Sequence, residues 1–209
     1  MKTIQSSSVN EIVINKSIFI THLFRVNTID EVNQHLQVIR KKYYDATHNC
    51  YAYILGSNTE IQKASDDGEP QKTAGIPMLD VLKKRDMTNV LAITTRYFGG
   101  ILLGAGGLIR AYSSSVSEAL NKASIYEYLD YKTIELTVSY SVYNTILSFL
   151  NEYQVFNTEY LDNVKITIGI KPELEDSFKK NVIDLACGQI SLKDLGISQM
   201  EILVKHNES

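Results

Sequence analysis

Apolar and polar residues alternate along the chain with two periods, and the change from one period to the other marks the expected elements. β-Branched residues dominate residues 9–26 on both sides of a polar turn at residues 15–17, which predicts two strands. Apolar residues then recur every three or four positions behind a capping box formed by Thr28 and Glu31, which predicts an amphipathic helix. Further strands are expected over residues 48–56 and 89–98, and residues 61–64 are a candidate for a short additional strand. Further helices are expected over residues 78–85 and from Leu108 onward.

The second half of the chain alternates in another order. Strands are expected over residues 133–140, 155–161, 164–170 and 200–205, and helices over residues 142–153 and 172–188. The order strand, helix, strand, strand, helix, strand is that of the ferredoxin-like (βαββαβ) motif. We therefore expect an α+β protein with a first domain over residues 1–124 and a ferredoxin-like domain over residues 125–209.

Composition narrows the class of protein. Of the 209 residues, 44% are hydrophobic and 22% are charged, as in an ordinary globular protein. No apolar run approaches the roughly 20 residues of a membrane helix, and the first residues lack the apolar core of a signal peptide. We therefore expect a cytoplasmic protein without a membrane partner. Cys50 and Cys187 lie far apart, which favours neither a disulfide framework nor a zinc site.

Charge is divided unevenly between the two halves. Residues 1–124 carry 14 Lys and Arg against 11 Asp and Glu, a net charge of +3, whereas the remainder carries 7 against 13, a net charge of −6. An excess of three is smaller than that of a typical nucleic-acid-binding domain. Only the first domain is suited by its charge to approach a polyanion.

A glycine-rich stretch over residues 94–115 lies between an apolar strand and a helix. It holds five of the chain's 11 glycines, which are Gly99, Gly100, Gly104, Gly106 and Gly107. Glycine allows close backbone approach, and a helix start behind such a loop offers unpaired N–H groups to an anion. The stretch lacks the ending of a P-loop, and Ile109 stands where a dinucleotide fingerprint has its third glycine. A phosphate or carboxylate site and a tightly packed turn both stay open.

Polar side chains at the ends of the predicted elements complete the candidate binding site. Besides the glycines, these are His48, Asp66, Asp67, Glu69, Lys72, Arg96 and Arg110. The three acids are of a type that holds Mg²⁺, and equally of a type that forms a turn and caps a helix. Arg96 also has a second interpretation as a structural ion pair with Asp66 or Asp67, and His48 as a hydrogen-bonded core residue. No catalytic motif is present, so we assign no catalytic residue, no metal and no cofactor.

Several blocks of this stretch resemble the Impact (YigZ-type) family. They are Asp-Asp-Gly-Glu-Pro at residues 66–70, residues 73–77, Arg-Tyr-Phe-Gly-Gly within residues 96–104, and residues 106–112. The similarity extends from near Lys16 to about Lys122, and the rest of the chain resembles the smaller C-terminal domain of bacterial members.

The resemblance carries expectations about fold and role. It implies a first domain with the fold of the second domain of ribosomal protein S5, which elongation factor G shares, and a ferredoxin-like second domain. Eukaryotic relatives restrain the amino-acid-starvation response by competing for the activator of a translation-initiation-factor kinase, a pathway that bacteria lack. The family has no established catalytic residues to transfer.

Three functions agree with these features. The first is a non-enzymatic, translation-associated regulator that binds RNA or a ribosome-linked protein through the first domain. The second is a Mg²⁺-dependent enzyme or binder that acts on a nucleotide or phosphorylated small molecule, with the glycine loop as the phosphate cradle. The third is a protein-interaction module in which the loop only packs. We expect the first, because the resemblance, the charge difference and the arginine-flanked loop favour it.

Overall fold

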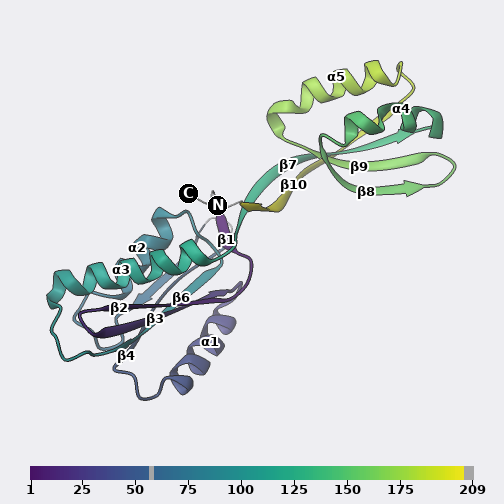
Figure 1. The fold of residues 1–209 in the computed structure, drawn as a ribbon. Coiled ribbons are helices and arrows are strands. Elements are labelled where there is room, and N and C mark those ends of the chain that lie inside the picture. Colours follow the sequence, from purple (N-terminus) through teal and green to yellow (C-terminus); the bar gives the residue numbers. More distant parts are fainter. Residues whose placement is uncertain (57–58, 205–209) are drawn as a thin grey trace. The chain divides into compact units, whose positions relative to one another are not determined.

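The computed structural model describes residues 1–56 and 59–204, which form two compact units (Figure 1). One unit contains Met1–Glu127 together with residues 202–204, and the other contains Tyr128–Glu201. The boundary expected between residues 124 and 125 stays a prediction, and strand β7 begins at that point. Within the described residues, no helix is long and apolar enough to cross a membrane.

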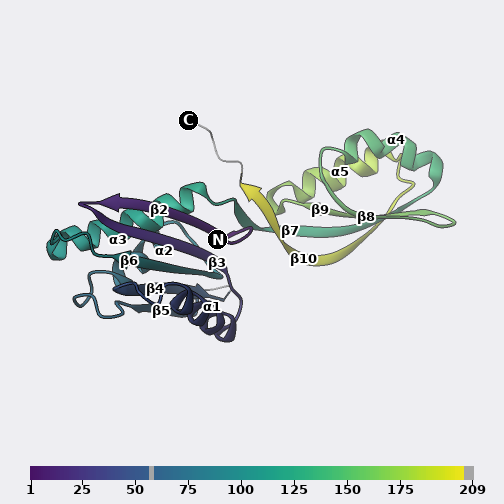
Figure 2. The same cartoon turned by 60° about the horizontal axis from the view of Figure 1, so that its bottom comes forward.

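The first unit is a five-stranded antiparallel sheet with helices on both faces (Figures 1 and 2). In spatial order, its strands are β2 (Ser8–Ile14), β3 (Ser17–Arg25), β6 (Val90–Tyr97), β4 (His48–Leu55) and β5 (Ile61–Ser65). Helix α1 (Ile29–Lys42) covers one face, and helices α2 (Gly75–Lys84) and α3 (Gly104–Lys122) cover the other.

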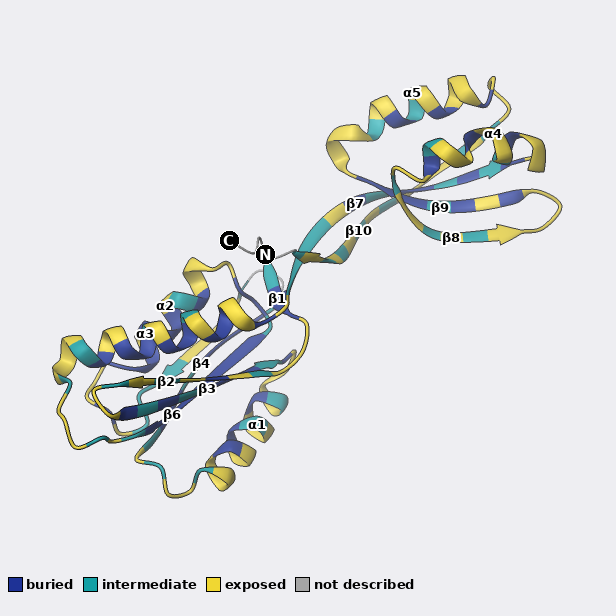
Figure 3. Cartoon of the chain, in the orientation of Figure 1, coloured by how far each residue is buried: buried dark blue, intermediate teal, exposed yellow. Residues whose placement is uncertain are grey.

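Strand β6 lies at the centre of this sheet and is buried on both faces (Figure 3). Val90 and Ala92 pack in the core beneath α2 and α3, whereas Leu91 and Ile93 pack in the core beneath α1. Successive side chains of a strand point to opposite faces, so an uninterrupted apolar run is what a doubly covered strand requires. The same strand ends at Arg96 and Tyr97, and so delivers a cation to one end of the sheet.

The second unit has the ferredoxin-like strand order. Its elements are β7 (Ile125–Val138), α4 (Tyr140–Leu150), β8 (Gln154–Tyr160), β9 (Val164–Ile170), a 3₁₀ turn (Pro172–Leu174), α5 (Glu175–Leu185) and β10 (Ser191–Val204). The strands lie in the order β10, β7, β9, β8, and a short strand, β1 (Lys2–Ile4), pairs with the first residues of β7. Ile134, Leu136 and Ile168 on the sheet pack with Phe178 of α5. The α+β class with two domains, the second of them ferredoxin-like, is confirmed, and the S5-type fold of the first domain stays a prediction.

Several element boundaries differ from the expected ones. Helix α3 begins at Gly104, four residues before Leu108, and α2 begins at Gly75 rather than at Met78. Strand β10 begins at Ser191 rather than at residue 200, and it pairs with β7. The sequence predicts a later start because the first half of this strand is polar and contains a glycine, which is the composition of a loop. The last residue of that predicted strand, Lys205, lies outside the described residues.

Candidate functional site

A pocket of about 480 Å³ opens where β4, β6 and α3 meet in the first unit. Eleven residues line it: Thr47, His48, Glu69, Pro70, Arg96, Phe98, Leu102, Leu103, Gly104, Ala105 and Leu108. Four of the twelve expected site residues, His48, Glu69, Arg96 and Gly104, therefore belong to the pocket wall. Most of the remaining lining side chains are apolar, which distinguishes this site from a purely ionic one.

A buried ion pair joins the acidic turn to the end of β6. The Nη1 atom of Arg96 donates to Oε1 of Glu69 at 2.7 Å, and the two side chains are only 7% and 3% exposed. The hydroxyl of Tyr112 donates to the same oxygen at 2.8 Å. Because a buried charge needs both a counter-charge and hydrogen bonds, these three groups form one interdependent cluster. Burial is the main reason that the pKa of Tyr112 is raised, so this hydroxyl stays a neutral donor.

Arg96 forms a structural ion pair, as its second interpretation predicts, but the predicted partner, Asp66 or Asp67, is wrong. The turn at residues 66–69 closes with a hydrogen bond from the Glu69 N–H to the Asp66 carbonyl, and the carboxylate that reaches Arg96 belongs to Glu69. Asp67 instead accepts from Arg40 at 3.0 Å and from the backbone N–H of Asn49 at 2.9 Å. The basic end of α1 is thus tied to the acidic turn by one of its three cations.

Asp66 caps the start of helix α2. Its Oδ1 accepts from the backbone N–H groups of Ala74 at 3.0 Å and Gly75 at 2.8 Å, and its Oδ2 accepts from that of Lys72 at 2.7 Å. A carboxylate at this position satisfies unpaired N–H groups and complements the helix dipole, which explains why α2 begins earlier than its apolar pattern predicts. Of the two interpretations of the acidic turn, the cap is the one that these contacts support. Among the described residues, no group of three His, Cys, Asp or Glu is arranged to hold a metal.

His48 connects the acidic turn to the pocket. Its Nδ1 lies 2.8 Å from the backbone carbonyl of Asp67, so this nitrogen carries the proton, and Nε2 lies 3.8 Å from Oε2 of Glu69. The side chain is therefore held in one orientation against the buried cluster. Its neighbour on β4, Cys50, contacts the Asp66 carbonyl and the Tyr112 hydroxyl, and burial raises the pKa of its thiol to about 12. Such a thiol is protonated at neutral pH and is not a nucleophile.

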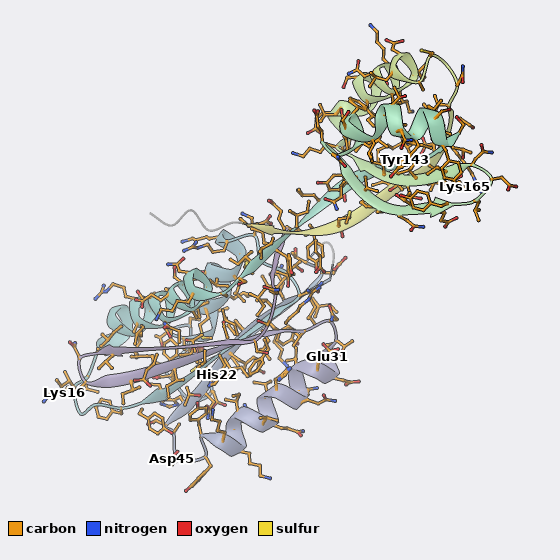
Figure 4. All side chains as sticks on the ribbon, turned by 45° about the vertical axis from the view of Figure 1, so that its right-hand side comes forward. Lys16, His22, Glu31, Asp45, Tyr143 and Lys165 are labelled. Carbon is orange, nitrogen blue, oxygen red and sulfur yellow. The ribbon has the colours of Figure 1, made fainter. Side chains whose placement is uncertain are left out.

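The glycine loop packs against the hairpin that joins β2 and β3. A Cβ atom on Gly99 would lie 2.0 Å from the backbone carbon of Lys16, so only glycine fits, and the Gly99 N–H donates to Oγ of Ser17 at 3.2 Å. Figure 4 shows Lys16 at the tip of this hairpin. The packed-turn interpretation therefore holds for the first part of the loop.

The second part of the glycine stretch is helical. Gly106 and Gly107 lie in the first turn of α3, which begins at Gly104 and which no side chain caps. No acidic residue lies in that turn, and the guanidinium of Arg110 lies near Gly106, where a Cβ atom would be 3.8 Å from Nη1. Arg110 and Lys72 are exposed, and Gly100 has nothing close to its α-carbon. These residues are close in sequence to lining residues such as Pro70, Phe98 and Leu108, but they do not line the pocket themselves.

Among the site residues that the sequence does not predict, three contribute most to the character of the site. Phe98 and Leu102 are 48% and 88% exposed on the pocket wall, and Tyr112 completes the buried cluster from α3. Apolar side chains in a polar, glycine-rich loop are a signal that the sequence does contain. The role of Tyr112 has no such signal, because its position in the apolar stripe of α3 predicts only packing.

Comparisons with known proteins find a matching family model for each of the two units. Residues 15–120 match the family model of the Impact N-terminal domain, and residues 136–189 match a domain of unknown function (DUF1949). IMPACT family member YvyE of Bacillus subtilis is 43% identical over 206 residues, which cover 98% of this chain and 95% of that protein. IMPACT family member YigZ of Escherichia coli is 31% identical over 183 residues, which cover 86% and 90%. A crystal structure of a hypothetical protein is similar with a TM-score of 0.59 at 28% identity, over 91% of this chain and 95% of that one.

Proposed function

Because this chain belongs to the Impact family, we propose that it is a translation-associated regulator that acts by binding, with the pocket and glycine loop of its first unit as the binding surface. The partner is RNA or a protein linked to the ribosome. The function that the resemblance implies for eukaryotic relatives, competition for an activator protein, is also a binding function, and this agreement supports the proposal.

One observation supports this proposal most strongly. The carboxylates and the thiol of the site are occupied by structural contacts or protonated, whereas apolar and cationic side chains near the pocket are exposed to solvent. The carboxylates of Asp66 and Glu69 accept hydrogen bonds from backbone N–H groups, Arg96 and Tyr112, and the Cys50 thiol is protonated. Around them lie an apolar pocket and exposed cations. A surface of this kind is suited to binding rather than to proton transfer or nucleophilic attack.

Sedimentation with purified bacterial ribosomes tests the proposal. The full chain is expected to pellet with ribosomes at low salt, and an excess of bovine serum albumin controls for nonspecific trapping. If the partner is RNA and Lys16, Lys72 and Arg110 contact three phosphates, affinity falls roughly 20- to 40-fold between about 50 and 200 mM salt. A chain that stays in the supernatant at every salt concentration contradicts the proposal.

The alternative of a Mg²⁺-dependent enzyme or nucleotide binder is favoured by one feature, the uncapped start of α3 beside the pocket. It needs carboxylate oxygens for the metal, and those of Asp66 and Asp67 already accept backbone and arginine N–H groups. Thermal unfolding with a panel of nucleotides and Mg²⁺ separates the two functions. A rise of the melting temperature with one nucleotide supports the alternative, and a flat response across the panel removes it.

A further inference from the structure

We propose that the pocket of the first unit docks an apolar side chain of a protein partner, and that acidic residues flank this side chain in the partner. The inference rests on the proposed function, because it names the class of partner that the same surface binds. It is carried by three features of the site: the apolar pocket wall, the neutralised floor and the exposed cations at the rim.

The pocket wall includes large apolar side chains that are exposed to solvent. Leu102 is 88% exposed and Phe98 is 48% exposed, and both line the pocket together with Leu103 and Leu108. Exposed apolar side chains that gather around a hollow are typical of protein interaction sites. The pocket also has a rigid frame, since the Gly99 backbone packs on the neighbouring hairpin.

The floor of the pocket carries charges that cancel. Arg96 is paired with Glu69, and its guanidinium also lies 5.7 Å from the centre of the Phe98 ring. An inserted charged group would compete with this buried pair and lose its own hydration. The pocket therefore selects an uncharged, apolar side chain, and it has the volume for one as large as leucine or phenylalanine.

The rim adds an electrostatic preference. Lys16, Lys72 and Arg110 are exposed around the loop, and none of them forms an ion pair with another described residue. Asp45, which accepts from the Tyr97 hydroxyl, is an exposed acid before β4 and offsets one of these charges. An excess of positive charge remains, so acidic residues beside the anchor would raise both the association rate and the specificity.

These features favour a protein over a single-stranded RNA. Sequence-tolerant RNA binding stacks successive bases on aromatic side chains along a basic groove. Here the two aromatic rings among the lining residues are Phe98, beside the aliphatic Leu102 and Leu103, and the imidazole of His48, which is hydrogen-bonded to the acidic turn. A hollow of this shape fits an anchoring side chain, whereas a base would gain little stacking from leucine.

A peptide selection tests the inference without a known partner. The full chain is used to select from a phage-displayed random dodecapeptide library, and synthetic copies of enriched peptides are titrated by fluorescence polarisation. We expect peptides with one leucine or aromatic anchor between acidic residues. Leu102→Ser should weaken them by at least about tenfold, since the variant replaces by a polar group a leucine that the bound peptide would cover. Arg110→Gln should weaken them about three- to tenfold, and more at low salt.

Matched controls come from helix α1 of the same unit. Val38→Ser changes another exposed apolar residue, and Lys41→Gln another exposed cation, and both should leave affinity within about twofold of the parent chain. Absence of enriched acidic peptides, or equal weakening by Leu102→Ser and Val38→Ser, overturns the inference. Self-association of the full chain in analytical ultracentrifugation that Leu102→Ser abolishes also overturns it, in favour of a second copy as the occupant.

Ribosome sedimentation then distinguishes this inference from the proposed function. If the parent chain pellets with ribosomes, Leu102→Ser does not, and both bind naked ribosomal RNA equally, the docking of a protein is supported. If parent and variant pellet equally, or if naked RNA binds the parent as tightly as ribosomes do, the docking inference fails while the proposed function stands. If the parent never pellets, the proposed function fails and the peptide titrations alone decide the inference.

Discussion

Replacing Glu69 by glutamine removes the counter-charge of Arg96 from the centre of the site. Both side chains are almost free of solvent, and the atoms Nη1 and Oε1 are 2.7 Å apart. At an effective dielectric constant of about 20, two unit charges at that distance attract by about 6 kcal/mol, and much of this is offset by their lost hydration. The variant keeps the desolvation of Arg96 and loses the attraction, so the free energy of unfolding should fall by about 3–5 kcal/mol.

Hydrogen exchange followed by mass spectrometry measures this loss where it occurs. Peptides from β4 and β6 should open more readily in Glu69→Gln, while peptides from β9 in the second unit should exchange as before. Glu118→Gln, an exposed change on α3, should stay within about 0.5 kcal/mol of the parent. The double variant Glu69→Leu with Arg96→Met removes both charges and should recover most of the lost stability. A loss below about 1 kcal/mol in Glu69→Gln would refute the buried ion pair as the support of the site.

Three further changes test individual contacts. Asp66→Ala removes the acceptor for three N–H groups at the start of α2 and should lower the free energy of unfolding by about 1–2 kcal/mol in circular-dichroism melts; an unchanged melt refutes the cap. Burial raises the pKa of Cys50 to about 12, so iodoacetamide at neutral pH should modify the exposed Cys187 and spare Cys50 until denaturant is added, and equal labelling of both contradicts this. Burial, with Lys42, lowers the pKa of His22 from 6.5 to about 4. The unfolded chain then takes up the proton first, and stability should fall as pH drops through that window; an identical pH slope in His22→Gln denaturation would contradict it.

The elements with a strong period were predictable from the sequence. The apolar run of β6 can be buried along its whole length as a central strand, and the three- to four-residue spacing of apolar residues in α1 places them on one face of a helix. The strand order of the second unit follows from its element order, since the ferredoxin-like arrangement is a compact solution for that succession. The expectation of an S5-type first domain came from the family resemblance, because the order of predicted elements in that half of the chain does not identify a fold.

The partners within the site were not predictable in this way. Asp66, Asp67 and Glu69 offer Arg96 the same chemistry, and the choice among them depends on a turn in which Asp67 adopts a positive φ of 43°. Glycines are typical of loops, so the sequence predicts the start of α3 too late, whereas in the structure Gly104 already begins the helix. Leu102 is not predictable as a site residue from its type, because an apolar residue is expected to be buried and its exposure depends on the fold.

Hydrogen exchange of the full chain with and without saturating ribosomes shows directly which surface the partner covers. We expect slower exchange in peptides that cover residues 66–73 and 96–110, together with unchanged exchange across Tyr128–Glu201. These are the segments that form the acidic turn, the glycine loop and the start of α3 beside the pocket. Protection confined to the second unit, or no protection in either unit, would contradict the claim that this surface is where the protein binds.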